Sequence, residues 1–332
     1  MSLLKETVAK IGDLDQEAME ICQNRLDSLT KPPGSLGVLE DMAKKLAGIT
    51  GKGQPTLGAK AIAVMAGDHG VVAEGVSAFP QEVTPQMVFN FLNQGAAINV
   101  LANHVGAKVV VVDVGVAAEL EHPQLISKKV KLGTDNMVQG PAMSRDEAIA
   151  AIEAGIQVAN ELVAEGVTIL GTGDMGIGNT TPSSAILAAC SEMPIEMLVG
   201  RGTGVNDQGL ELKRKAINEA LAVNKPDPQD GVDLVGKVGG LEIAAIAGLV
   251  LGAAANRVPV VIDGFIAGAG ALVASRISGK AVNFMIPSHV SVEPGHKLTL
   301  ELLGLKPMLY MDMRLGEGTG AALAMNLVEA AV

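Results

Sequence analysis

Glu317 stands in a glycine-rich segment near the end of the sequence, and its chemistry could be that of a general base. The segment reads R-L-G-E-G-T-G at residues 314–320 and runs directly into an Ala-rich helical pattern. A carboxylate there gains little from packing. A weakly polar pocket formed by Leu315 and nearby methionines would raise its pKa into the range useful for taking a proton. The alternative is an acid that only interacts with the dipole at a helix N-terminus.

A second glycine-rich segment, G-T-G-D-M-G at residues 171–176, follows a short apolar run and precedes Gly178, Asn179 and Thr180 at the start of a helical pattern. Backbone N–H groups at a helix N-terminus bind phosphate, and the two polar side chains would add donors. The spacing also fits the G-x-G-x-x-G fingerprint, so an NAD-dependent oxidoreductase is the alternative. The acid that follows, Glu196, does not end a convincing second strand, which favours a single phosphate.

A third loop, G-R-G-T-G at residues 200–204, could place backbone donors against a ribose or phosphate. Helical periodicity brings Lys213 to the same side, although a lysine in this context is by itself more typical of a solvated surface. Residues 231–237 resemble a P-loop, but Val238 stands where Mg²⁺ needs a hydroxyl. The histidines lack the spacing of metal ligands, and we predict no metal site.

Short, continuously apolar runs separated by longer helical patterns predict strands that are covered on both faces. The strand runs are residues 61–65, 109–114, 167–170, 258–262 and 281–286, and the clearest helices are residues 84–102, 145–164, 207–221 and 241–255. The predicted fold is α/β, a Rossmann-like three-layer arrangement with a parallel sheet between helices. Nearly every strand runs into glycine and a polar residue. Because the carboxyl ends of parallel strands meet at one edge, these residues predict a single crevice.

The two ends of the chain, residues 3–29 and 320–332, show helical patterns without a strand between them and the main sheet. We expect them to form one small helical subdomain together. The predicted division is a parallel-sheet catalytic core over residues 50–299, and a subdomain that joins residues 1–49 to residues 300–332 and carries the Glu317 loop.

Composition excludes several classes of partner. A formal net charge of -11 with one Tyr and no Trp offers neither the basic surface nor the stacking platforms that nucleic acid requires. The most apolar stretch, residues 243–255, is shorter than the ~20 residues of a spanning helix, so no membrane partner is expected. Cys22 and Cys190 lie in apolar helical contexts, which indicates buried thiols in a reducing compartment. The N-terminus shows no secretory signal, and we expect a cytoplasmic protein.

Eight segments follow one another along essentially the whole chain: K-P-P-G-S-L-G at 31–37, G-D-H-G at 67–70, E-G-V at 74–76, G-N-T-T-P at 178–182, K-V-G-G at 237–240, D-G-F at 263–265, P-S-H at 287–289 and R-L-G-E-G at 314–318. Together they resemble the nicotinate-nucleotide:dimethylbenzimidazole phosphoribosyltransferases. The first and last segments are the most specific.

This resemblance implies transfer of the phosphoribosyl group of nicotinate mononucleotide to 5,6-dimethylbenzimidazole, with Glu317 as the catalytic base. Asp174 matches a second acidic position that often carries Glu, so its carboxylate is one methylene shorter and its catalytic role stays open. The resemblance further implies a homodimer without cofactor or metal. The benzimidazole slot would comprise Phe79, Met87, Met175 and Leu315, and the nucleotide would contact Gly176, Gly178, Asn179, Thr180, Gly202, Lys213, Gly264 and Ser291.

Overall fold

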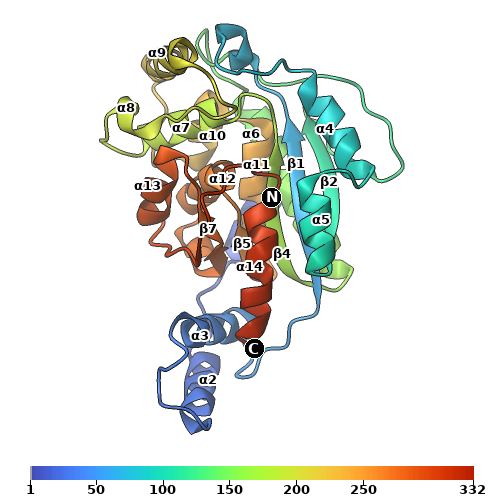
Figure 1. The fold of residues 1–332 in the computed structure, drawn as a ribbon, viewed down its shortest axis with the longest axis vertical. Helices are drawn as coiled ribbons and strands as arrows, with labels where there is room; N and C mark the ends of the chain where they lie inside the picture. The colour runs from blue at the N-terminus through green and yellow to red at the C-terminus, as the bar shows by residue number, and fades with distance from the viewer. Residues whose placement is uncertain (1) are drawn as a thin grey trace.

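The computed structural model describes residues 2–332, and its main sheet has the strand order β3-β2-β1-β4-β5-β6 with all neighbours parallel (Figure 1). The order reverses between β1 and β4. Open α/β sheets bind ligands at such a reversal, beyond the carboxyl ends of the strands. The predicted parallel sheet is confirmed, with strands β1 (Ala59–Gly67), β2 (Ala107–Gly115), β3 (Leu125–Ser127), β4 (Val167–Met175), β5 (Val260–Ile262) and β6 (Met285–Pro287).

Both faces of this sheet are covered, as the burial of β1 shows. Its residues 61, 63 and 65 belong to a hydrophobic cluster with one set of helices, and residues 62, 64 and 66 belong to a cluster with another set. This separation follows from the alternation of side chains along a strand. The first set is α6 (Arg145–Ala164), α11 (Leu241–Ala255) and α12 (Phe265–Ile277), and the second is α4 (Val83–Leu92), α5 (Ala97–His104) and α14 (Thr319–Ala330).

Two predicted elements were wrong in part. The helix expected over residues 84–102 is two helices, α4 and α5, because Gln94 between them has a φ of 63° and lies in the left-handed region. The strand expected over residues 281–286 is mostly the 3₁₀ turn η2 (Gly279–Phe284), and β6 starts only at Met285. Ala281 and Phe284 are both buried, and their spacing of three places them on one side of a 3₁₀ helix.

The terminal segments pack on different neighbours. Helix α1 (Leu3–Lys10) contacts α6 and α11, whereas α14 contacts α3 (Val38–Thr50), α5 and β4. Figure 1 shows α3 and α2 (Gln16–Ser28) projecting from the lower end of the molecule. The division into a 50–299 core and a joint terminal subdomain stays a prediction.

The predicted capping box at the start of α6 is confirmed, since Ser144 and Glu147 each accept the other's backbone N–H. Among residues 2–332, no helix combines the length and apolarity that a membrane crossing requires. The remaining elements are α7 (Thr180–Ala189), α8 (Ile195–Leu198), α9 (Asp207–Asn224), α10 (Gly231–Val238), α13 (Pro294–Leu302), the 3₁₀ turn η1 (Gly70–Glu74), and the parallel pair β7 (His289–Val290) and β8 (Leu309–Tyr310).

Candidate active site

A cavity of about 300 Å³ lies beyond the carboxyl ends of β4 and β5, at the predicted crevice. All predicted site residues except Gly178 and Lys213 line it. Sequence reasoning did not select several others, among them residues of the α12 N-terminus and of the β7 region. The full lining is Phe79, Val83, Met87, Asp174, Met175, Gly176, Ile177, Asn179, Thr180, Gly202, Thr203, Gly264, Phe265, Ile266, His289, Ser291, Glu293, Arg314, Leu315, Gly316 and Glu317.

Glu317 occupies the loop just before α14 and is only 6% exposed. Its Oε2 accepts the backbone N–H of Ile98, in the first turn of α5, at 3.1 Å. Burial raises the pKa of Glu317, the Ile98 N–H lowers it, and the nearby Asp263 carboxylate raises it again, with a net upward shift. Glu317 thus has the raised pKa of a general base, together with a fixed orientation.

Asp263 follows β5 directly and is buried beneath the Glu317 loop. Its Oδ1 accepts the N–H groups of Gly320 at 2.7 Å and Ala321 at 3.0 Å, and its Oδ2 accepts that of Gly318 at 3.1 Å. Burial raises the pKa of Asp263 to about 6, and these N–H groups limit the rise. The sequence contained a signal for Asp263, since it is one of the polar residues that follow strands.

Asp174 lies at the end of β4, and its Oδ2 accepts a hydrogen bond from the Asn179 side chain at 3.1 Å. Burial raises its pKa well above the usual range, and the carboxylates of Asp263, Glu242 and Glu317 raise it further. Like charges this close oppose simultaneous ionisation. The cluster therefore favours one ionised base over several, and Asp174 is the member whose pKa is shifted most clearly towards the neutral form.

The predicted G-x-G-x-x-G fingerprint does not form a dinucleotide turn, because Gly171 and Gly173 lie inside β4. Gly173 instead makes room for the loop before α14: a Cβ there would lie 2.6 Å from the Glu317 carbonyl oxygen. Gly173 allows this backbone segment to approach the strand closely, whereas a Cβ at Gly171 would meet the side chains of Met325 and Ile62. The two glycines therefore give no support to the interpretation as an NAD site.

The N-termini of α7 and α12 also reach the cavity, where Asn179, Thr180, Gly264 and Phe265 contribute to the lining. Free N–H groups at helix N-termini attract anions. This arrangement suits a phosphate. Gly178 lies outside the lining, in the turn that leads into α7.

Lys213 is not the solvated residue that its context alone suggested, since it is 1% exposed. Its Nζ donates to Thr180 Oγ1 at 2.7 Å and to the Gly200 carbonyl oxygen at 3.1 Å. Burial lowers the pKa of Lys213 to about 8. It stands behind the cavity wall and fixes the Thr180 hydroxyl and the 200–204 loop relative to each other.

A buried pair lies behind the same wall. His69 Nε2 and Glu242 Oε1 are 2.8 Å apart, and both side chains are buried. Burial opposes the charged imidazole, but the Glu242 carboxylate outweighs this effect and raises the pKa of His69. Asp68 Oδ2 accepts the N–H of Ala117 at 2.8 Å. Asp68 and His69 therefore brace the strand ends rather than face the cavity.

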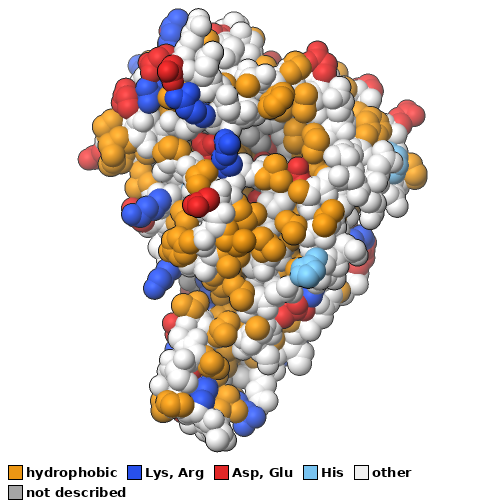
Figure 2. Space-filling view, viewed as in Figure 1, with side chains coloured by type: hydrophobic (Ala, Val, Ile, Leu, Met, Phe, Trp, Pro, Cys, Tyr) orange, Lys and Arg blue, Asp and Glu red, His pale blue; other side chains and the backbone are white. Residues whose placement is uncertain are grey.

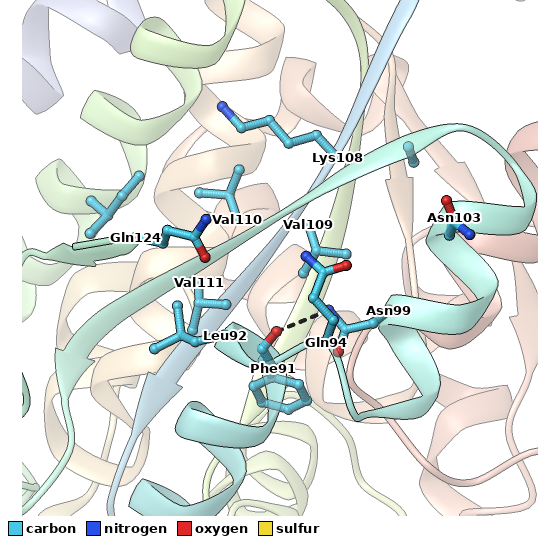
Figure 3. Close-up of a pocket in the computed structure, with 12 residues that line it drawn as sticks. Phe91, Leu92, Gln94, Asn99, Asn103, Lys108, Val109, Val110, Val111 and Gln124 are labelled. Carbon is cyan, nitrogen blue, oxygen red and sulfur yellow. Dashed lines mark hydrogen bonds between the residues drawn. The ribbon is translucent and has the colours of Figure 1, made fainter. Parts of the chain in front are cut away.

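A second cavity, of about 450 Å³, lies beside β2, α4 and α5 (Figure 3). Asn99 lines it and also accepts the N–H of Ala96 and donates to the Phe91 carbonyl oxygen at 3.0 Å. Asn99 thereby fixes the turn from which Ile98 reaches Glu317. The other lining residues are Leu92, Gln94, Asn103, Ala107, Lys108, Val109, Val110, Val111, Gln124 and Ile126, with Phe91 itself.

Comparison with known proteins gives consistent matches over nearly the whole chain. A family model described as phosphoribosyltransferase matches residues 11–332. The nicotinate-nucleotide--dimethylbenzimidazole phosphoribosyltransferase of Desulforamulus reducens is 59% identical over 100% of this chain and 95% of its own. The protein of the same name from Chloroflexus aggregans is 57% identical over 100% and 94%. The crystal structure of CobT from Thermus thermophilus matches with a TM-score of 0.91 at 50% identity and covers 95% of both chains.

Proposed function

This chain belongs to the phosphoribosyltransferase family, and from that membership we propose that it transfers the 5-phosphoribosyl group of nicotinate mononucleotide to 5,6-dimethylbenzimidazole. The products are nicotinate and α-ribazole 5′-phosphate, which supplies the lower ligand of cobalamin. One observation carries the proposal: a buried carboxylate with a raised pKa, Glu317, shares a cavity with two helix N-termini. Such a cavity combines a candidate base with a candidate anion site.

The reaction needs one base. The bond between C1′ and the pyridinium nitrogen breaks, and its electron pair neutralises the nicotinate ring, so the leaving group needs no proton. One ring nitrogen of the benzimidazole attacks C1′ from the opposite face, which converts the β-linkage to α. Glu317 takes the proton from the other ring nitrogen. A raised carboxyl pKa brings this group closer to the acidity of the proton it removes.

The benzimidazole slot is assigned to Phe79, Met87, Met175 and Leu315, which line the cavity together with Glu317. Apolar side chains of this kind suit a flat aromatic ring, and a few polar groups then set its orientation. The aromatic and aliphatic side chains at the mouth are half exposed, with Phe79 at 52% and Leu315 at 58%, so a bound ring would cover them.

The nucleotide is assigned to the glycine and polar residues of the lining, which are Gly176, Asn179, Thr180, Gly202, Gly264 and Ser291. The 5′-phosphate would accept N–H groups from the α7 and α12 N-termini. Lys213 would act through Thr180 rather than by direct contact, and Gly178 would act through the turn into α7. Local donors of this kind bind an anion on a protein whose net charge is -11.

We further infer a homodimer. Apolar side chains gather over the centre of the face that carries α14 and β7 (Figure 2). Tyr310 and Met311 are exposed a few positions before the lining residue Arg314, and Leu36 and Val38 are exposed at the start of the projecting α3. Large exposed apolar groups of this kind are typical of interaction surfaces. Light scattering at micromolar concentration would give twice the 33.9 kDa chain mass for a dimer.

A cytoplasmic location is the remaining inference. Cys22 and Cys190 are both free thiols in the structure, which is usual for proteins of a reducing compartment. Fractionation of the native cells and detection of the protein in the cytosol would support the inference.

The test of the proposed reaction is chromatographic detection of nicotinate. We expect nicotinate to form from nicotinate mononucleotide only when dimethylbenzimidazole is also present, with one ribazole phosphate formed per nicotinate. Nicotinate release without the base would instead identify a hydrolase. Binding of NAD in preference to the mononucleotide would favour the oxidoreductase alternative.

A further inference from the structure

The geometry points to Asp263 as a positioning residue that holds the N-terminus of α14 and thereby sets the place of the Glu317 carboxylate. This inference rests on the proposed function, because it assigns Glu317 the role of base. Asp263 does not line the cavity and would not touch the substrates. It would act through the backbone of the segment that carries the base.

Asp263 accepts several backbone hydrogen bonds at the start of α14. The opening N–H groups of a helix have no partner inside the helix. Here the amides of Gly318, Gly320 and Ala321 all donate to the Asp263 carboxylate, at 2.7 to 3.1 Å. An ordinary cap comes from the residue just before the helix, but Asp263 comes from the end of β5, 55 to 58 positions away. It ties α14 to the sheet.

The backbone of the loop that carries Glu317 adopts an unusual conformation. Gly316, Glu317 and Gly318 all have positive φ, at 82°, 62° and 95°. A non-glycine residue in this region is strained and persists where its surroundings hold it there. Glu317 therefore needs external restraint. The Ile98 N–H restrains its side chain, and Asp263 restrains the residue next to it.

Asp263 itself is also fixed. Its backbone N–H donates to Thr172 Oγ1 at 2.9 Å, and its carbonyl oxygen accepts from Ser288 Oγ at 3.0 Å. Thr172 is in β4, and Ser288 follows β6, so the anchor is held from the strands on both sides of β5. Asp263 therefore fixes the position of the Glu317 loop relative to the sheet.

The chemistry of a carboxylate suits this anchor. Two oxygens can accept three N–H groups, whereas an amide would turn one NH₂ group towards a backbone donor. The negative charge also meets the positive end of the α14 dipole. Replacing Asp263 by Asn therefore keeps the size of the side chain but leaves Gly318, the neighbour of the base, facing a donor.

The decisive variant is Asp263→Asn, compared with Asp113→Asn as a matched control. Asp113 is also buried at a strand end and accepts a backbone N–H, from Val116 at 2.9 Å, but it lies outside the cavity. We expect Asp263→Asn to lower kcat about 100-fold, the cost typical of misplacing a catalytic group by about 1 Å. The KM values should stay within about threefold of the wild-type values, since the contacts that bind the substrates equally in the ground state and the transition state are unaffected. Asp113→Asn should retain the wild-type kcat.

The pH dependence of kcat distinguishes a positioning role of Asp263, which includes the effect of its charge on Glu317, from general damage to the structure. Asp263 raises the pKa of Glu317, so its removal should move the acid limb of the kcat profile to lower pH. The other charged or titratable groups that line the cavity with Glu317 are Asp174 on β4, His289 on β7, Glu293 just before α13 and Arg314 in the loop, and all four stay in place. An unshifted limb, or a kcat equal to that of the wild type, would overturn the inference.

Amide exchange tests the anchor without any substrate and without any substitution. In the wild-type protein, NMR should show slower exchange for Gly318, Gly320 and Ala321 than for the amide of Glu317 in the same loop. Equal rates would refute the anchor even if Asp263→Asn failed to fold. If the wild type formed no ribazole phosphate while these amides stayed protected, the proposed function would fail and the anchoring would stand.

Discussion

Ile98 donates its backbone N–H to Glu317 Oε2 at 3.1 Å, across 219 positions of sequence. The bond joins the first turn of α5 to the loop before α14, on the side of the sheet that both helices cover. A carboxylate held by one N–H keeps its other oxygen available to a proton donor in the cavity. The Ile98 N–H belongs to the N-terminal turn of α5, so a helix-dipole acid would make the same contact, and the role of Glu317 as a general base is a prediction that its replacement tests.

Glu317→Gln should lower kcat about 10³-fold, because the amide cannot take the benzimidazole proton while its carbonyl can still accept the Ile98 N–H. The dissociation constant of nicotinate mononucleotide should remain close to the wild-type value. Steady-state kinetics and calorimetry measure the two quantities. Full activity in this variant would remove Glu317 from the mechanism.

Asp174→Asn should have a smaller effect, with kcat within about tenfold of the wild type, because Asn resembles the protonated acid that the cluster favours. The folded state raises the pKa of Asp174, so it binds that proton more tightly than the unfolded chain does. The associated stability is present at low pH and is lost as pH rises through the folded pKa. Thermal melts from pH 5 to 9 should therefore show a flatter Tm profile in the variant. A loss of kcat as large as that of Glu317→Gln would make Asp174 catalytic instead.

Loss of the Lys213 proton should weaken nucleotide binding in alkaline solution. Its pKa is lowered to about 8, so the ammonium that holds Thr180 and the 200–204 loop loses its proton above that pH. The KM for nicotinate mononucleotide should rise as pH increases from 7 to 9, while kcat changes little. Lys213→Met should show a high KM at every pH in this range. A wild-type KM that did not change with pH would contradict the role assigned to this amine.

Gly173→Ala, a substitution in β4, should displace the loop that carries Glu317. The new methyl would lie 2.6 Å from the Glu317 carbonyl oxygen, so the loop or β4 must shift. Overpacking of this kind costs about 1–3 kcal/mol, and kcat should fall along with Tm. Gly140→Ala is the matched control, since a Cβ there meets nothing within 4 Å. Equal Tm and kcat in both variants would show that the contact is easily relieved.

The sequence predicted the sheet, its layers and the place of the crevice because these depend on local patterns. Continuous apolar runs identified the strands, and the polar residues after them identified the edge. The split between α4 and α5 depends on the backbone at Gln94, which the periodicity of residues 84–102 does not contain. The mostly apolar run 281–286 suggested a strand, but Asn283 interrupts it, and its first four residues belong to the 3₁₀ turn Gly279–Phe284.

The sequence predicted most residues that line the cavity, but it did not predict the contacts that hold them in place. Glycine at positions 171 and 173 matched a phosphate fingerprint, and only the tertiary structure shows that Gly173 admits the Glu317 loop and that Gly171 packs against side chains of α14 and β1. Lys213 had the sequence context of a surface residue, and its burial arises from contact with a different helix. The link from Asp263 to α14 is likewise invisible to local patterns, because its partners lie 55 to 58 positions away.

The junction between α5 and the α14 loop also has a consequence for the order in which function appears during folding. Contacts between distant segments form late, because closing a long loop precedes any gain from the contact. On refolding from denaturant, strand pairs that are closer in sequence, such as β1 with β2, should form before Glu317 reaches Ile98. Recovery of catalysis would then lag behind recovery of the far-ultraviolet circular dichroism, and a compact but inactive chain would accumulate in between.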